Sequence, residues 1–203
     1  MRGADVATIG ILIFEGVEEL DFVGPWEVFT AAAHVAGDGR DRVCLIAETL
    51  TPVRCAKGMR VLPDVSLVDA PALDVLVVPG GIGTRAAAKD QALMGWLAQR
   101  AGQCQWVTSV CTGALLLVEC GAARGRQVTT HHSFVETLRA RGDATVLAGI
   151  RFVRDGKVVS SAGVSAGIDM ALWLVGQLRD PGFARSVQHY IEYYPAPPYT
   201  AQL

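Results

Sequence analysis

Uninterrupted apolar runs alternate along this chain with longer segments of helical periodicity. The runs at residues 7–14, 74–78 and 106–110 are apolar or β-branched, which is typical of strands covered on both faces. Further strands are predicted at residues 42–47, within 52–67 on either side of Lys57-Gly58, at 126–130, and as a hairpin of 151–155 and 158–161. Helices are predicted over residues 25–36, 91–103, 114–120, 133–140, 165–178 and 181–191.

The helix boundaries rest on a few punctuating residues. Pro25 is expected in the first turn of its helix, where its missing N–H is tolerated. Ser133 is expected to cap the helix that follows it. The Pro- and Tyr-rich tail, residues 193–203, is expected to be extended.

Alternating strands and helices predict an α/β protein with a mainly parallel central sheet and helices on both faces. The chain has 203 residues, of which 51% are apolar, and neither an internal repeat nor a linker is evident. We therefore expect one domain over residues 1–203.

Charge and cysteine content narrow the function. The formal net charge is −2 and no run of Lys or Arg occurs, which argues against a nucleic-acid partner. No stretch is long and apolar enough for a membrane span, and no secretory signal is evident. Five cysteines form no spaced framework, so we expect a reduced, cytoplasmic protein with no membrane partner.

Three segments end predicted strands in unusual residues. These are residues 14–21, Pro79-Gly80-Gly81 and Cys111-Thr112-Gly113. In an open parallel sheet, ligand sites form outside the carboxyl ends of the strands. We expect a functional site where these segments meet.

The segment around Cys111 resembles a nucleophile elbow. Ser109 and Gly113 supply the small neighbours that a sharp strand-to-helix turn requires. The start of the following helix is expected to lower the pKa of the thiol and favour the thiolate. Position alone leaves a second interpretation open, because most core cysteines are structural. The other four cysteines lack this setting and are expected to be structural.

Other candidates carry weaker signals. The glycine loop 79–83 could offer N–H groups to a developing negative charge, or it could be a tight turn. Asp21 could serve as a proton donor and acceptor, or as a helix cap. His131 and His132 are adjacent and would point to opposite faces of an extended segment, so no metal site is predicted.

Several ordered motifs resemble the ThiJ/PfpI superfamily. They span nearly the whole chain and comprise residues 16–21 with Gly24-Pro25, 78–81, 108–115, 129–131 and 162–169. The resemblance implies a flavodoxin-like three-layer sandwich, a homodimer, and no metal or organic cofactor. It also implies that Cys111 is a reactive nucleophile.

Within the superfamily, the chain is most similar to the branch that hydrates isocyanides (isonitriles) to N-substituted formamides. Thr112 after the nucleophile, Asp21 as the acidic partner, and the late segment 192–199 carry this likeness. The resemblance implies a lyase with covalent cysteine catalysis, in which Cys111, Asp21 and Thr112 act on a small-molecule substrate. It implies backbone orientation of the thiolate or adduct at Gly80, Gly81 and Val164, with His131 as a possible supporting residue.

Other functions remain open at this stage. Glyoxalase and amidase-type hydrolase activities occur in the same superfamily, and an exposed thiolate could instead serve as a redox or stress sensor. Regulators of the AraC type begin with a domain of this superfamily and continue into a helix-turn-helix domain of about 100 residues. This chain ends at Leu203 without a basic helix, so we expect that function only of a truncated chain.

Overall fold

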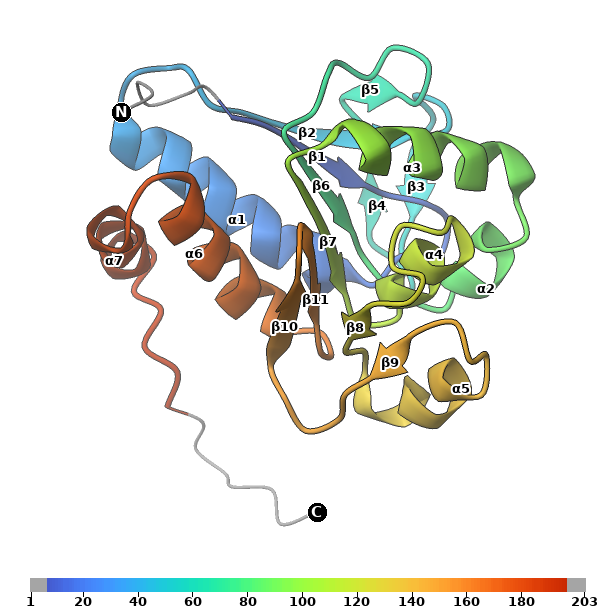
Figure 1. Cartoon of the computed structure of the whole chain (residues 1–203). Coiled ribbons are helices and arrows are strands. Elements are labelled where there is room, and N and C mark those ends of the chain that lie inside the picture. Colours follow the sequence, from blue (N-terminus) through green and yellow to red (C-terminus); the bar gives the residue numbers. More distant parts are fainter. Residues whose placement is uncertain (1–6, 197–203) are drawn as a thin grey trace.

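A computed structural model describes residues 7–196 and shows a seven-stranded sheet between two layers of helices (Figure 1). The strand order is β10-β11-β7-β6-β1-β2-β5, and every neighbouring pair is parallel except β10 with β11. The chain therefore has the predicted flavodoxin-like α/β fold with a mainly parallel sheet. The strands are β1 (Thr8–Leu12), β2 (Arg42–Ala47), β5 (Val65–Ser66), β6 (Val75–Val78), β7 (Trp106–Val110), β10 (Phe152–Asp155) and β11 (Val158–Ser161).

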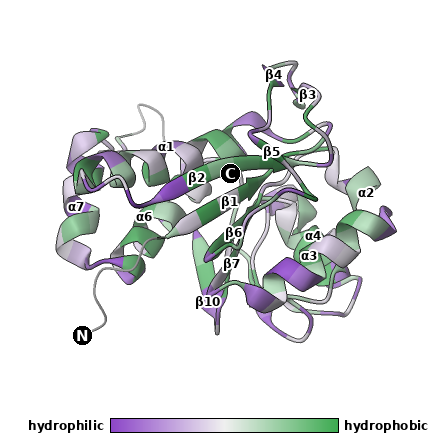
Figure 2. Ribbon diagram, turned by 90° about the horizontal axis from the view of Figure 1, so that it is seen from above, coloured by the Kyte–Doolittle hydropathy of each residue, from purple (hydrophilic) through white to green (hydrophobic). Residues whose placement is uncertain are grey.

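Each face of the sheet buries its own apolar core. Helices α1 (Glu19–Ala36), α6 (Ala166–Leu178) and α7 (Pro181–Tyr190) cover one face (Figure 1). Helices α2 (Thr84–Ala87), α3 (Gln91–Gln103), α4 (Gly113–Glu119) and α5 (Val135–Arg139) lie on the other side. The central strands are hydrophobic along their length in Figure 2, as burial on both faces requires.

Short elements complete the fold and were the hardest to predict. Residues 52–67 form an antiparallel pair, β3 (Val53–Arg54) with β4 (Arg60–Val61), and then β5. A second small sheet pairs β8 (Gln127–Val128) with β9 (Thr145–Val146), and η1 (His132–Phe134) lies between them in the chain. Helix α2 and strand β9 were not predicted, because elements of two to four residues show no periodicity.

Helix α1 begins at Glu19 rather than at Pro25, so the predicted start is wrong by six residues. Pro25 lies inside the helix and cannot donate a hydrogen bond to the carbonyl of Asp21. The helix continues because Pro25 is buried where α1 packs against α6, close to Gly167. As a result, Asp21 lies in the first helical turn and not before it.

Ser133 does not cap its helix as predicted. Instead, the imidazole Nδ1 of His131 accepts a hydrogen bond from the Ser133 amide at 3.2 Å, and the helix starts with the 3₁₀ turn of η1. The predicted extended tail falls partly on residues 197–203, which lie outside the described residues. None of the helices over residues 7–196 has the length and apolar character that a membrane crossing requires.

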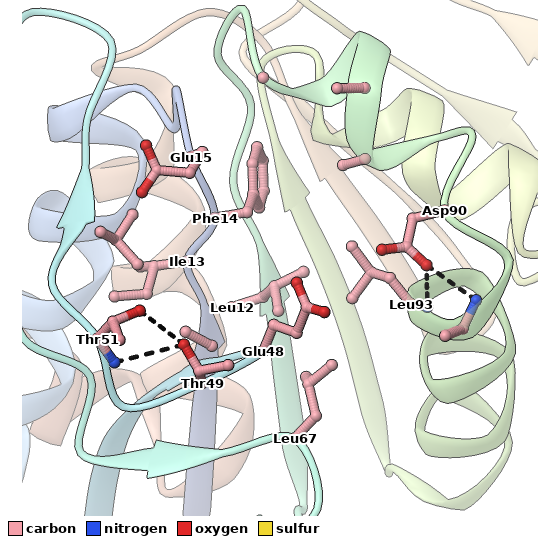
Figure 3. Close-up of a pocket in the computed structure, with 16 residues that line it drawn as sticks. Leu12, Ile13, Phe14, Glu15, Glu48, Thr49, Thr51, Leu67, Asp90 and Leu93 are labelled. Carbon is pink, nitrogen blue, oxygen red and sulfur yellow. Dashed lines mark hydrogen bonds between the residues drawn. The ribbon is translucent and has the colours of Figure 1, made fainter.

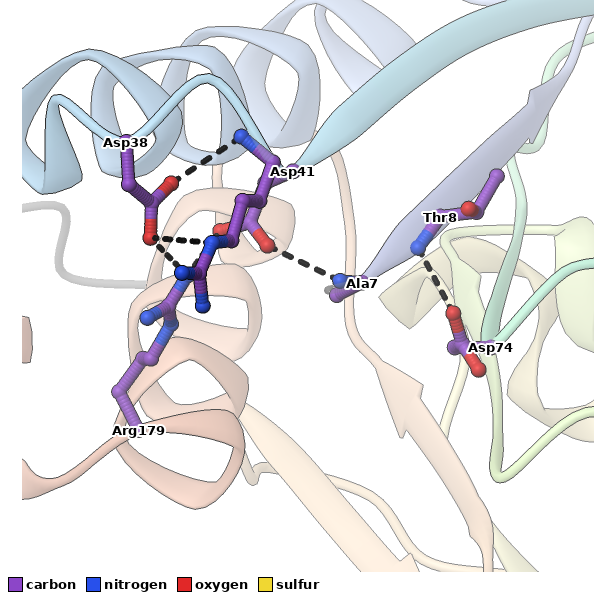
Figure 4. A network of polar contacts seen from close by, with 7 residues as sticks. Ala7, Thr8, Asp38, Asp41, Asp74 and Arg179 are labelled. Atoms are coloured by element: carbon purple, nitrogen blue, oxygen red, sulfur yellow. Dashed lines mark hydrogen bonds and ion pairs between the residues drawn. The ribbon is translucent and has the colours of Figure 1, made fainter. Parts of the chain in front are cut away.

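Carboxylates secure the amino ends of the strands, at the edge of the sheet opposite the candidate site (Figure 4). Asp41 accepts the Ala7 amide at 2.9 Å and pairs with Arg179 at 2.8 Å. Asp74 accepts the Thr8 amide at 2.8 Å. These contacts satisfy backbone donors that the first strand would otherwise leave unpaired.

Candidate active site

Three neighbouring strand ends bring the candidate residues together. In the order β7-β6-β1, Cys111 directly follows β7, Gly80 follows β6, and Asp21 lies two residues into α1 after β1. The site therefore forms at the carboxyl edge of the sheet, as the parallel topology requires.

Cys111 adopts the left-handed backbone conformation of a sharp turn. Its φ angle is 56°, a conformation that costs a non-glycine residue about 1–3 kcal/mol. The surroundings hold it there: its N–H donates to the carbonyls of Ser161 and Ala162, and its own carbonyl accepts the Thr130 hydroxyl at 2.8 Å. A side chain at Gly113 would lie 2.1 Å from the Val78 carbonyl oxygen, so the small residue expected there is required.

The carboxyl of Asp21 is completely buried and faces the sulfur of Cys111. Its Oδ2 accepts the Gly80 amide at 2.8 Å. Among the described residues, Oδ1 has no hydrogen-bond partner. A buried carboxyl with one fixed oxygen and one free oxygen can take up a proton or release it.

Burial raises the pKa of Asp21 from 3.8 to about 7. The Gly80 amide opposes this shift, and the negative charge of Glu18 adds to it. The carboxyl therefore changes its protonation state near neutral pH, as general acid–base work requires.

Burial also raises the pKa of the Cys111 thiol to about 12, and the charge of Asp21 contributes to the increase. The expected lowering of this pKa is therefore wrong for the resting site. Two backbone amides, of Thr112 and Val164, and the Thr112 hydroxyl act on the sulfur in the opposite direction, but burial outweighs them. Thiol and carboxyl together behave as one acid pair, in which the second proton is hard to remove.

The pKa does not distinguish Cys111 from the other cysteines, because burial raises those of Cys44, Cys55 and Cys104 to about 11 as well. What distinguishes Cys111 is its geometry. It combines a left-handed turn, backbone donors at the sulfur and a carboxyl beside it. Cys111 retains 6% of its surface, so the residue is not completely buried.

The amides of Gly80 and Gly81 do not point at the thiolate or an adduct, as the family resemblance implied. Their amides are taken up by side chains of the site: Gly80 donates to Asp21, and Gly81 donates to the Thr112 hydroxyl at 3.0 Å. They therefore orient the acid and the threonine instead of facing an adduct. A side chain at Gly80 would lie 2.5 Å from the Thr112 amide nitrogen and 2.9 Å from Asp21 Oδ2.

Thr84 is a site neighbour that sequence reasoning missed. Its buried hydroxyl donates to the Gly81 carbonyl at 2.8 Å and lies 3.3 Å from the Thr112 hydroxyl. No sequence motif marks it, because it lies in the short helix α2.

Val164 occupies the second strained position of the site. Its φ angle of 42° is an outlier for a β-branched residue, and its N–H acts on the Cys111 sulfur. His131 reaches this turn and not the thiol: a side chain at Gly163 would lie 2.4 Å from Cδ2 of the His131 ring. Burial, followed by the charge of His132, lowers the pKa of His131.

A separate cavity of about 310 Å³ lies beyond the carboxyl ends of β1 and β2 (Figure 3). Neither Cys111 nor Asp21 lines this cavity. Its wall nevertheless includes Glu15 and Gly83, which lie in the loops after β1 and β6. Its floor is mostly apolar, and Glu48 and Asp90 stand on its rim. Over residues 7–196, no three or more His, Cys, Asp or Glu side chains are grouped to hold a metal ion.

Comparison with known proteins adds three findings. The DJ-1/PfpI family matches residues 7–177. An isonitrile hydratase of Pseudomonas putida is 37% identical over 94% of this chain and 80% of its own length. A glutathione-independent glyoxalase of Caenorhabditis elegans is 27% identical over 82% of this chain and 86% of its own length.

Solved structures give the same relationship. The crystal structure of a THiJ/PfpI family protein from Pseudomonas syringae superposes with a TM-score of 0.87. It is 33% identical in sequence and covers 97% of this chain and 79% of its own. DJ-1beta of Drosophila melanogaster, at 20% identity, shares the fold with a TM-score of 0.80 over 93% of this chain and 99% of its own.

Proposed function

Because the chain belongs to the DJ-1/PfpI family, we propose that it is a hydratase that adds water to isocyanides and releases N-substituted formamides. In this proposal Cys111 is the nucleophile, and Asp21 is the group that moves protons. The likeness to an isonitrile hydratase at 37% identity supports the choice of substrate class.

The observation that carries the proposal is the buried pairing of Asp21 with Cys111. One oxygen of the carboxyl is fixed by the Gly80 amide and the carboxyl faces the sulfur, with a pKa near neutrality. Addition to an isocyanide needs a nucleophile and a proton donor at the same carbon atom. A thiol and a titrating carboxyl that faces it supply both.

In the first half of the reaction, the sulfur of Cys111 attacks the terminal carbon of the isocyanide. Asp21 accepts the thiol proton and passes it to that carbon. A carbon–sulfur bond and a carbon–hydrogen bond form, and the carbon–nitrogen triple bond becomes a double bond. The product is a thioimidate on Cys111, and no proton is gained or lost overall.

In the second half, water attacks the thioimidate carbon while Asp21 draws a proton from the water and transfers it to the imine nitrogen. The tetrahedral adduct then collapses: the carbon–sulfur bond breaks, a carbonyl forms, and the proton from the new hydroxyl returns to the departing sulfur. The net reaction consumes one isocyanide and one water and yields one formamide, with the thiol regenerated.

Thr112 and Val164 stabilise the negative charge that develops on the sulfur during these steps. Both backbone amides, and the Thr112 hydroxyl, favour the charged form of Cys111. Such donors are most effective in a buried site, where water does not compete with them.

The proposal is tested by assaying formamide production from an aryl and an alkyl isocyanide. We expect the parent to turn over, and Cys111→Ala and Cys111→Ser to lose activity by roughly 1,000-fold or more while remaining folded. Cys44→Ala is the matched control, because it removes a half-buried thiol in β2. Parental turnover by the Cys111→Ala protein would exclude covalent catalysis at this residue.

A substrate panel distinguishes the hydratase from related activities. Methylglyoxal and a peptide substrate are assayed beside the isocyanides, because one relative is a glyoxalase. We expect the ratio of kcat to KM to be highest for an isocyanide. A higher value for methylglyoxal would favour the glyoxalase function on the same Cys111 and Asp21.

We further propose a homodimer of single-domain subunits in a reducing compartment. Exposed apolar side chains of Leu50, Met59 and Leu62 gather around the β3–β4 hairpin and offer a contact surface. All five cysteines are free thiols. Sedimentation of the purified chain at several concentrations measures its oligomeric state.

A further inference from the structure

We propose that Arg151, Asp169 and Tyr193 form a positioning unit that holds the turn at residues 162–165, and with it the Val164 amide, in place beside Cys111. This inference rests on the proposed function only for its effect on turnover. The contacts themselves concern the turn at residues 162–165, which connects β11 to α6 and is hydrogen-bonded to Cys111.

The turn needs support because Val164 is held in a left-handed conformation with φ at 42°. Such a conformation persists only where the surroundings fix it. On one side the Ala162 carbonyl accepts the Cys111 amide at 2.9 Å. On the other side the Ala162 amide donates to the carbonyl of Arg151 at 2.8 Å.

The guanidinium of Arg151 spans the far end of the same turn. Its Nε donates to Asp169 Oδ2 at 2.7 Å, and its two terminal nitrogens each lie 3.3 Å from the Ser165 hydroxyl. Ser165 directly follows Val164, and Asp169 lies in the first turn of α6. Arg151 thus contacts both ends of the turn, through its backbone at Ala162 and through its side chain at Ser165.

Tyr193, which follows α7, is the third member of this unit. Its hydroxyl donates to Asp169 Oδ1 at 3.0 Å, so both carboxylate oxygens of Asp169 are occupied. Glu192, directly before Tyr193, has a left-handed φ of 49°, and Gln188 holds the Tyr193 backbone through two hydrogen bonds of 3.1 and 3.0 Å. Tyr193, from the late segment 192–199, therefore contacts α6 beside the turn at residues 162–165.

The ion pair itself is too exposed to contribute much to stability. The side chains of Arg151 and Asp169 are 51% and 27% accessible, and pairs of this kind contribute little to the free energy of unfolding. A change in this unit should therefore leave the fold intact and act mainly on the turn. Because the Val164 N–H favours the charged sulfur, its displacement raises the pKa of Cys111 further.

The test measures the rate of alkylation of Cys111 by iodoacetamide at several pH values between about 6 and 9, read by mass spectrometry of the Cys111 peptide. For Arg151→Gln and Asp169→Asn we expect this rate to fall about tenfold at each pH, because a smaller fraction of the thiol is ionised. Arg151→Lys cannot span both partners and is expected to restore only part of the rate. Tyr193→Phe is expected to slow alkylation about threefold.

Matched controls separate positioning from a loss of charge or fold. Arg124→Gln removes an equal charge from a surface pair with Asp143 at 3.8 Å and should leave the alkylation profile unchanged. The double variant Arg151→Gln/Asp169→Asn should be no slower than either single variant, because both remove one unit. Folded single variants with the parental alkylation profile would overturn the positioning role.

The alkylation assay does not depend on the identity of the substrate. A shifted profile together with no isocyanide turnover by any form, parent included, would refute the proposed function and leave the positioning unit standing. If the parent turns over isocyanides and folded Arg151→Gln does so at the same rate, the positioning unit is refuted and the proposed function stands. Besides the members of the unit, Asp21 and, across Gly163, His131 are titratable groups near the turn, and both are retained in every variant.

Discussion

At the scale of single residues, the site depends on Asp21, whose ionised form is destabilised by its buried position. Asp21 is 0% exposed and has one unpaired oxygen, so its ionised form is poorly solvated. Glycine at position 80 allows its amide to reach that carboxyl. Acid and base chemistry near neutral pH therefore comes at a cost in stability.

The sign of that cost can be tested with Asp21→Asn. The folded-state pKa of Asp21, about 7, is higher than its ordinary value of 3.8, so the folded form binds the extra proton between these values. The carboxyl therefore lowers stability progressively as the pH rises through that window, and its full cost is present above it. We expect Asp21→Asn to raise the free energy of unfolding by about 1–3 kcal/mol at pH of about 8.

The same variant should differ little from the parent at a pH of about 3, where Asp21 is mostly protonated in both the folded and the unfolded state. Turnover should fall by roughly 100-fold or more, because the amide cannot move protons. Chemical denaturation at the two pH values measures the first effect. Equal destabilisation at both pH values would contradict the assigned ionisation.

Sequence alone reached the residues but not their contacts. Cys111 and Asp21 were identified through strand ends and family motifs, yet the direction of the thiol pKa was predicted wrongly. The prediction considered the helix after Cys111 and could not weigh burial, which depends on packing from α1 and α6. For the same reason the partners of Gly80 and Gly81 could not be predicted.

At the scale of elements, close approach between α4 and β6 sets the elbow. Helix α4 begins at Gly113, where a side chain would meet the Val78 carbonyl at 2.1 Å. The strands that carry the site were predicted to within a few residues because they are continuous, mostly apolar runs that are buried on both faces. The start of α1 was not, because Pro25 suggested a boundary that packing against α6 overrides.

Gly113→Ala tests this close approach. The added methyl group must push α4 away from β6, and we expect a loss of about 2–4 kcal/mol in the free energy of unfolding together with reduced turnover. Gly95→Ala in α3 is the matched control, because nothing lies within 4 Å of the added group. It should instead stabilise the chain by about 0.5–1 kcal/mol. Urea denaturation compares the two, and equal effects would contradict the packing argument.

At the scale of the whole molecule, the amino edge of the sheet carries stabilising contacts and the carboxyl edge carries the candidate site. The amino edge is held by the ion pair of Asp41 with Arg179 and by carboxylates that accept strand amides. The carboxyl edge carries two left-handed non-glycine residues, Cys111 and Val164, and the buried acid. The fold class follows from strand–helix alternation alone, whereas the site requires the spatial order β7-β6-β1, which no local pattern encodes.

The most direct measurement is the mass of the enzyme quenched with acid during turnover of an aryl isocyanide. The proposed mechanism predicts an increase equal to one isocyanide, located on the Cys111 peptide of the parent and reduced in Asp21→Asn, which cannot deliver the proton that completes the adduct. Formamide production at the parental rate by Cys111→Ala, with no adduct on the parent at any time, would contradict it.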